Sequence, residues 1–239
     1  MSDLQRFAAS FERDGFAVVD DAFDPDLMER LDALLNDHFG HAPTYLHDES
    51  FIGDAQVEVV PWFPVRDDGV AAFDEVEDDA RLRELTDAVL GAGWYSQYCM
   101  AMHSAAGSTG QPWHQDCPPE RTEVFNLNRL VYTRDIDPAN GGQLVVQPGS
   151  HRHGELPAGE PHEPFDGELV ITPRRGTLVF VHGHCWHRVL PVHHRSRNSI
   201  NYRAAPAGTP ADVTDVCVYR NMRYRFSTGE VVEERTVDA

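Results

Sequence analysis

The chain has 239 residues, of which 41% are hydrophobic and 25% are charged, a composition typical of a globular protein and not of a disordered one. The formal net charge of −19 disfavours contact with phosphate backbones, so we expect no nucleic-acid partner. No apolar run reaches the roughly 18 residues of a membrane-spanning helix, and the first residues lack the pattern of a signal peptide, so we expect a cytoplasmic protein without a membrane partner.

The first third of the chain carries the pattern of helices. Near the start, apolar residues recur every three or four positions, as on one face of a helix: Leu4, Phe7, Ala8 and Phe11. Residues 16–19 then form a short β-type run. Asp24-Pro25 is a typical helix start, with an acidic N-cap before a proline, and a third helix is expected from the pair Asp78-Asp79 to Gly91.

After Gly93 the sequence changes to short β-type runs separated by turn signals such as Asn140-Gly141 and Pro148-Gly149. These runs cover residues 94–102, 130–133, 143–146, 169–171, 177–181, 188–192, 199–202 and 216–220. Many short strands at this spacing favour a sandwich or a barrel. We therefore predict one domain over residues 1–239, mainly β, with a helical part over 1–92 and a β-core over 93–239.

Two stretches have no regular pattern. Residues 41–79 are acidic, and residues 155–167 are rich in proline, glycine and glutamate. Long loops of this kind in a compact domain are either lids and binding loops or disordered segments. The sequence leaves both interpretations open for each stretch.

The segment Pro112-Trp113-His114-Gln115-Asp116 carries the first candidate for chemistry. Side chains two residues apart on an extended chain point to the same side, so His114 and Asp116 are able to reach one cation. A His-x-Asp pair alone is weak support for a metal site because it arises often by chance.

A third candidate ligand, His187, begins the β-type run that follows the strand and turn at residues 176–186. His182 and His184 are alternatives on histidine content alone. Two histidines and one carboxylate on one face of an octahedral metal are the arrangement of Fe(II) oxygenases, because three positions stay open. Arg197 opens the next β-type run, and its planar guanidinium is suited to bind a carboxylate of a co-substrate.

The sequence also resembles the phytanoyl-CoA dioxygenase (PhyH-like) family of Fe(II)- and 2-oxoglutarate-dependent oxygenases. The matching stretches keep their order and spacing over most of the chain: Phe11–Val19, Trp113–Asp116, Asn140–Gly154, Gly176–His187 and Arg197–Tyr202. The resemblance implies a double-stranded β-helix (jelly-roll) core with an N-terminal helical layer. It implies iron bound by His114, Asp116 and His187, and 2-oxoglutarate anchored by Arg197.

Two features depart from the family pattern or extend it. The spacing from His187 to the anchoring arginine is about one residue shorter than is usual in the family, so Arg195 is an alternative to Arg197. His103 is a further candidate for contact with 2-oxoglutarate, and Trp113 is a candidate substrate wall because it adjoins His114. Since Asp116 is present, the chain does not resemble the halogenating branch, in which a small residue stands at that position.

These residues predict a dioxygenase that uses Fe(II), 2-oxoglutarate and O2 to hydroxylate a C–H bond of a small molecule, in natural-product biosynthesis or a similar setting. Desaturation, epimerisation and ring closure are variants of the same chemistry. Two other classes remain open: a metal-dependent jelly-roll isomerase or epimerase that does not use O2, and a catalytically silent binding protein. The sequence does not name the substrate, and it allows a monomer or a homodimer.

Overall fold

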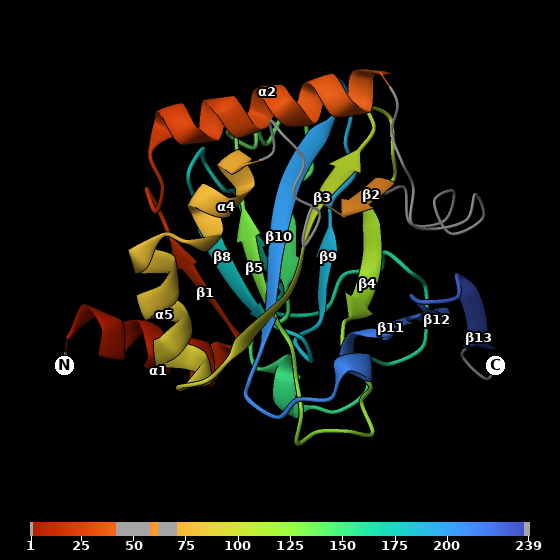
Figure 1. Cartoon of the computed structure of the whole chain (residues 1–239). Helices are drawn as coiled ribbons and strands as arrows, with labels where there is room; N and C mark the ends of the chain where they lie inside the picture. Colours follow the sequence, from red (N-terminus) through yellow and green to blue (C-terminus); the bar gives the residue numbers. More distant parts are fainter. Residues whose placement is uncertain (1, 42–57, 62–70, 237–239) are drawn as a thin grey trace.

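The structure is a computed structural model that describes residues 2–41, 58–61 and 71–236 (Figure 1). Its strands form two antiparallel sheets that face each other. In spatial order the six-stranded sheet contains β1 (Phe16–Val19), β8 (Leu178–His182), β5 (Leu127–Val131), β10 (Arg197–Ala205), β3 (Tyr95–Ser104) and β2 (Glu58–Pro61). The seven-stranded sheet contains β13 (Glu230–Glu234), β12 (Met222–Arg225), β11 (Val216–Tyr219), β4 (Gln111–Gln115), β9 (His187–Val189), β6 (Leu144–Val146) and β7 (Leu169–Ile171).

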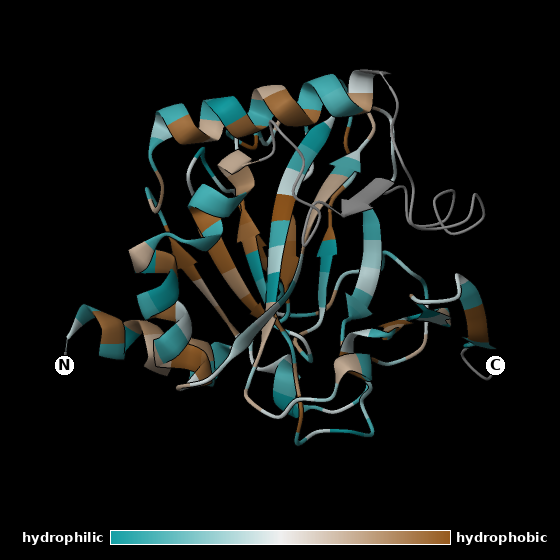
Figure 2. Ribbon diagram, in the orientation of Figure 1, coloured by the Kyte–Doolittle hydropathy of each residue, from teal (hydrophilic) through white to brown (hydrophobic). Residues whose placement is uncertain are grey.

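Helices cover the outer face of the six-stranded sheet (Figure 1). They are α1 (Asp3–Asp14), α2 (Pro25–His41), α4 (Ala71–Glu77) and α5 (Ala80–Leu90). Hydrophobic residues recur along α2 and gather in β5 and β8 beneath the helices (Figure 2). The main core lies in this layer, where helix residues such as Met28 and Leu82 pack with Phe180 and Ile200 of the sheet. The predicted jelly-roll core with an N-terminal helical layer is confirmed.

The sequence signals explain where these helices begin and end. Ser2 and Gln5 form a capping box at the start of α1, and Gly15 ends the helix in a left-handed conformation with φ 79°. The Asp79 side chain accepts from Leu82 N and so caps α5, as the predicted start at Asp78-Asp79 required. None of the described helices is long and apolar enough to cross a membrane.

The stretch 155–167 is an ordered loop packed on the outer side of the seven-stranded sheet. Its backbone carbonyls accept hydrogen bonds from Trp113 N (to Pro161, 3.0 Å), Arg188 Nη1 (to His162, 2.6 Å) and Trp113 Nε1 (to Glu163, 3.0 Å). These contacts attach the stretch to β4 and β9, and a role as a lid or binding loop stays a prediction. Within the stretch 41–79, residues 71–77 form α4, which the sequence did not predict, and residues 42–57 and 62–70 lie outside the described part of the chain.

Candidate metal centre

The end of β4 and the start of β9 bring the three predicted ligands together. His114 and His187 are directly paired across these two antiparallel strands, and Asp116 follows β4 by one residue. One ligand atom from each of the three residues lies within 4.8 Å of the other two, and all three residues are buried. Nε2 of His114 is 3.9 Å from Oδ1 of Asp116, and Nε2 of His187 is 3.6 Å from Oδ2. The expectation that His114 and Asp116 share one side is therefore fulfilled.

The two alternative histidines lie outside this group. His182 stacks on Phe125 with ring centroids 4.1 Å apart, and Nε2 of His184 is 2.9 Å from the Val124 carbonyl. Among the described residues, only His114, Asp116 and His187 form a cluster that could hold a metal ion.

Both ligand histidines are held in the tautomer that a metal requires. Nδ1 of His114 lies 2.9 Å from the Pro112 carbonyl, and Nδ1 of His187 lies 2.9 Å from the Cys185 carbonyl. A carbonyl only accepts, so each Nδ1 carries the proton and each Nε2 keeps its lone pair toward Asp116. Burial, with His187 as the second cause, lowers the pKa of His114 to about 3, and burial also lowers the pKa of His187. The imidazoles are therefore neutral at neutral pH, as metal binding demands.

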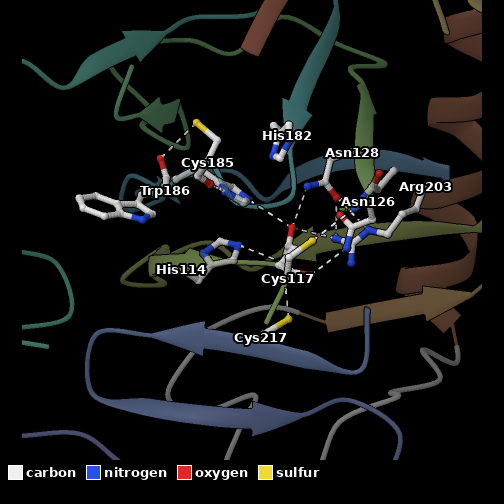
Figure 3. Close-up of polar contacts among 12 residues, drawn as sticks. His114, Cys117, Asn126, Asn128, His182, Cys185, Trp186, Arg203 and Cys217 are labelled. Atoms are coloured by element: carbon white, nitrogen blue, oxygen red, sulfur yellow. Dashed lines mark hydrogen bonds and ion pairs between the residues drawn. The ribbon is translucent and has the colours of Figure 1, made fainter. Parts of the chain in front are cut away.

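Asp116 is held in its ionised form. Burial alone would raise its pKa, but Arg203 and the two histidines, together with the Asn128 amide, outweigh burial and hold the pKa below its usual range. Arg203 Nη2 donates to Oδ2 at 2.9 Å, and Asn128 Nδ2 donates to the same oxygen at 2.7 Å. In Figure 3 Arg203, Asn128 and Cys217 surround the segment that follows His114. Two neutral imidazoles and one carboxylate are the donor set of a divalent transition metal.

The cluster opens on a cavity between the two sheets. Its lining combines apolar and aromatic side chains with a few polar groups, including Arg197, Asn201 and Arg203 of β10. Arg197 is almost fully buried, and its Nε donates to the Gly142 carbonyl at 2.8 Å. Arg195 instead lies on the surface and pairs with Asp137, so of the two candidate anchors only Arg197 reaches the cavity.

Hydroxyl groups surround the Arg197 guanidinium. Nη1 donates to Ser199 Oγ at 3.1 Å, and Nη2 donates to Tyr132 Oη at 3.2 Å. Ser104 is paired with Arg197 across β3 and β10, and its buried Oγ has no hydrogen-bond partner among the described residues. A buried guanidinium beside several hydroxyl groups, one of which has no hydrogen-bond partner among the described residues, is suited to bind a carboxylate.

A family comparison agrees with this geometry. The model of the family described as "Phytanoyl-CoA dioxygenase (PhyH)" matches residues 11–196, which is more than half of the chain. The chain belongs to the PhyH family. It is thus a member of the Fe/2-oxoglutarate oxygenases with an intact His-Asp-His triad. None of the curated proteins is similar enough in sequence to match this PhyH-family chain.

Solved structures share the fold at low sequence identity. The epimerase SnoN, solved in complex with Fe3+, alpha ketoglutarate and nogalamycin RO, has a TM-score of 0.69 and 17% identity over 99% of this chain and 95% of its own. HygX from Streptomyces hygroscopicus, with nickel and 2-oxoglutarate bound, has a TM-score of 0.68 and 16% identity over 87% of this chain and 88% of its own. AviO1 from Streptomyces viridochromogenes Tue57 has a TM-score of 0.64 and 20% identity over 88% and 98%.

Two other predicted site residues of this PhyH-family chain do not line the cavity. Met102 faces the cavity, so strand alternation turns its neighbour His103 to the outer face, where it stacks on Phe39 with centroids 4.5 Å apart. Trp113 is fully buried in a separate cluster that includes Trp186, beneath the loop 155–167. The structure brings together the triad and Arg197, and it leaves His103 and Trp113 apart from them.

Arg203 and Asn128 are the site residues that the sequence analysis missed. A signal for Arg203 was present, since polar residues alternate along β10 at Arg197, Ser199, Asn201 and Arg203. Ile200 and Tyr202 lie between the last three of these, and such alternation on a strand indicates a polar inner face. Asn128 has no such pattern, because every residue of β5 is buried.

Proposed function

We propose that this PhyH-family chain is an Fe(II)- and 2-oxoglutarate-dependent dioxygenase that hydroxylates a C–H bond of a small molecule. The observation that carries the proposal is one buried cavity that holds the neutral His114 and His187, the ionised Asp116 and the buried Arg197. Metal ligands and a carboxylate anchor in one cavity are the parts that this reaction needs.

The triad would hold the iron through Nε2 of His114, Nε2 of His187 and one carboxylate oxygen of Asp116. Bound there, iron supplies the oxidising chemistry in which substrate, O2 and 2-oxoglutarate give hydroxylated substrate, succinate and CO2. The protein's own contribution is position: Asp116 N donates to the Gly183 carbonyl at 2.7 Å, which ties the carboxylate segment to the turn before His187. This hydrogen bond fixes the segment that carries Asp116 relative to the strand that carries His187.

Arg197 would hold the distal carboxylate of 2-oxoglutarate, with the hydroxyls of Tyr132, Ser199 and Ser104 as further donors. The Gly142 carbonyl fixes the guanidinium before the co-substrate binds, which reduces the entropy lost on binding. Leu130 and Leu144 line the same cavity and are suited to exclude water from it.

A small organic substrate is supported by the remaining lining. Tyr98, Tyr219, Tyr224 and Phe226 form an aromatic wall, most of it on β11 and β12 and the residue after them. Aromatic faces bind ring-bearing molecules, and natural products of that kind are consistent with HygX, which was solved with hygromycin B. Epimerisation, the reaction named for SnoN, uses the same site parts, so the product decides between the two outcomes.

The test is an anaerobic titration of metal-free protein with Fe(II) and then 2-oxoglutarate, followed by the visible charge-transfer band of the chelated complex. We expect the band in the wild type and its loss in Asp116→Ala and His187→Ala, with His184→Ala as a matched histidine control. If Fe(II) binds and 2-oxoglutarate gives no band, the oxygenase function is wrong and an isomerase that does not use O2 replaces it. Succinate release then identifies substrates, and mass spectrometry separates a product with one added oxygen from an epimer.

A further inference from the structure

We propose that Arg203, acting with Asn128, is a positioning residue that restricts Asp116 to binding the metal through one oxygen and so keeps one metal position open for O2. The inference rests on the iron and 2-oxoglutarate function proposed above. It concerns a residue that touches a ligand of the metal and not the metal itself.

The hydrogen bonds of Asp116 distinguish its two oxygens. Oδ2 accepts from Asn128 Nδ2 at 2.7 Å and from Arg203 Nη2 at 2.9 Å, whereas among the described residues the one hydrogen bond to Oδ1 is the weak contact from Cys217 Sγ at 3.5 Å. A carboxylate oxygen has about two lone-pair sites, so those of Oδ2 are filled. Distance to the histidines does not make this choice, because His187 Nε2 is 3.6 Å from Oδ2 and His114 Nε2 is 3.9 Å from Oδ1. The filled lone pairs leave Oδ1 as the metal ligand.

A buried network fixes Arg203 in this role. Its Nε and Nη2 donate to Asn128 Oδ1 at 2.9 and 2.5 Å, and Asn201 Nδ2 donates to the same oxygen at 2.7 Å. The guanidinium also lies over the ring of Tyr98, with its Cζ 5.3 Å from the ring centroid. The planar guanidinium thus donates to Asn128 and Asp116 at the same time, whereas a lysine presents a single point charge.

The number of coordination positions on the metal explains why Asp116 should bind through one oxygen. An octahedral ion has six positions, and the two histidines with one carboxylate oxygen leave three. 2-Oxoglutarate chelates two of these, so a single position remains for O2. If Oδ2 also bound the metal, that last position would be filled. Arg203 and Asn128 prevent this by occupying Oδ2.

The experiment compares the wild type with Arg203→Met, Arg203→Lys and Asn128→Leu, and uses Arg129→Met as the matched control. Arg129 neighbours Asn128 on β5, is fully buried and pairs with Glu77 at 2.8 Å, but it lies on the face of the sheet away from the metal centre. Three quantities are measured without oxygen: the Kd of Fe(II), the charge-transfer band with 2-oxoglutarate, and binding of nitric oxide to that complex by EPR. Nitric oxide is the probe because it takes the position open to O2.

We expect the affinity for nitric oxide to fall on the order of 10- to 100-fold in Arg203→Met, with a smaller loss in Arg203→Lys and Asn128→Leu. The control should keep the wild-type affinity even if its melting temperature falls. If the Arg203 and Asn128 variants bind iron and 2-oxoglutarate and take up nitric oxide like the control, the positioning role is wrong and the proposed function stands. If the wild type itself binds no 2-oxoglutarate, the function fails and the inference fails with it. Should Arg203→Met not fold, Arg203→Lys and Asn128→Leu decide the question.

Discussion

Removal of the Arg197 guanidinium is expected to weaken the binding of 2-oxoglutarate about 100-fold and to leave the binding of Fe(II) unchanged. Only 4% of the residue is exposed, and Gly142, Ser199 and Tyr132 already fix its position. A hydrogen bond to a charged group contributes roughly 1.5–3 kcal/mol, and a carboxylate accepts more than one from a guanidinium. A loss of about 3 kcal/mol in Arg197→Ala corresponds to roughly two orders of magnitude in Kd.

The assay is the anaerobic titration of the charge-transfer band with 2-oxoglutarate at saturating Fe(II). Arg195→Ala is the matched control, because that arginine is two residues away, lies on the surface and pairs with Asp137. Arg197→Lys should fall between the two, since lysine keeps the charge and loses the fork. A Kd in Arg197→Ala within about twofold of the wild type would refute the reasoning, since a buried charge pair is worth far more than that. A larger loss in Arg195→Ala than in Arg197→Ala would make Arg195 the anchor.

Three further predictions follow from the site and its supports. The free energy of unfolding of the metal-free protein should decrease as the pH falls from 6.5 towards about 3, because the unfolded chain binds a proton at His114 where the folded chain does not. Urea titrations at several pH values should show a shallower pH dependence in His114→Asn than in the wild type. Equal pH dependence in the two proteins would contradict this cause. Arg129→Met should destabilise the fold by about 3 kcal/mol, the lower end for a broken buried pair, because the partly buried Glu77 loses its arginine and keeps the hydrogen bond from Ser96 Oγ. A loss under about 1 kcal/mol in chemical denaturation would contradict this cause. Gly110→Ala should lower both the melting temperature and the affinity for Fe(II). Gly110 has φ 82°, and an added Cβ would lie 2.2 Å from a backbone oxygen of β9, the strand that carries His187. Unchanged iron affinity would mean that β4 and β9 move apart without displacing the metal ligands.

Local signals made much of the fold predictable. The capping box at Ser2, the proline after Asp24 and the N-cap at Asp79 each define a helix start through a local hydrogen bond or a fixed dihedral angle. Most strands from β3 to β11 also coincide with β-type runs, because turn residues separate them. In each case the information lies within a few residues of the element that it specifies.

The elements that the sequence analysis missed depend on distant contacts. Helix α4 is short and acidic, and burial of Phe73 and Val76 beneath the neighbouring elements accounts for it. Strands β12 and β13 carry many charged residues, and cross-strand pairs such as Arg223 with Glu233 at 3.0 Å stabilise them. The same limit applies to the site: His114 and Asp116 could be paired by strand alternation, but no local rule reports that Arg203 crosses from another sheet to bind Asp116.

The position of His103 illustrates how one residue of register decides a role. Strand β3 turns Tyr98, Met100 and Met102 into the cavity, so His103 must lie on the opposite face of the sheet. On that face it contacts Phe39 of α2 and Asn198 of β10. A resemblance over a stretch of sequence fixes the approximate place of a contact along the strand. The side of the sheet follows only from the pairing with the neighbouring strands.

Strand β10 connects the fold to the proposed chemistry. Its outer face packs Ile200 and Tyr202 into the core beneath the helices, while its inner face presents Arg197 and Arg203 to the cavity. Two arginines buried in a β-core would be strongly destabilising without partners, yet each has several: hydroxyls and a carbonyl around Arg197, and a carboxylate and an amide around Arg203. Arg203 gains its partner from the metal ligand Asp116, so the residue that orients the ligand is itself stabilised by it. Arg197 lines the cavity with hydroxyl groups around it, which is why we propose that this end of the strand binds the co-substrate and that the Arg203 end serves the metal.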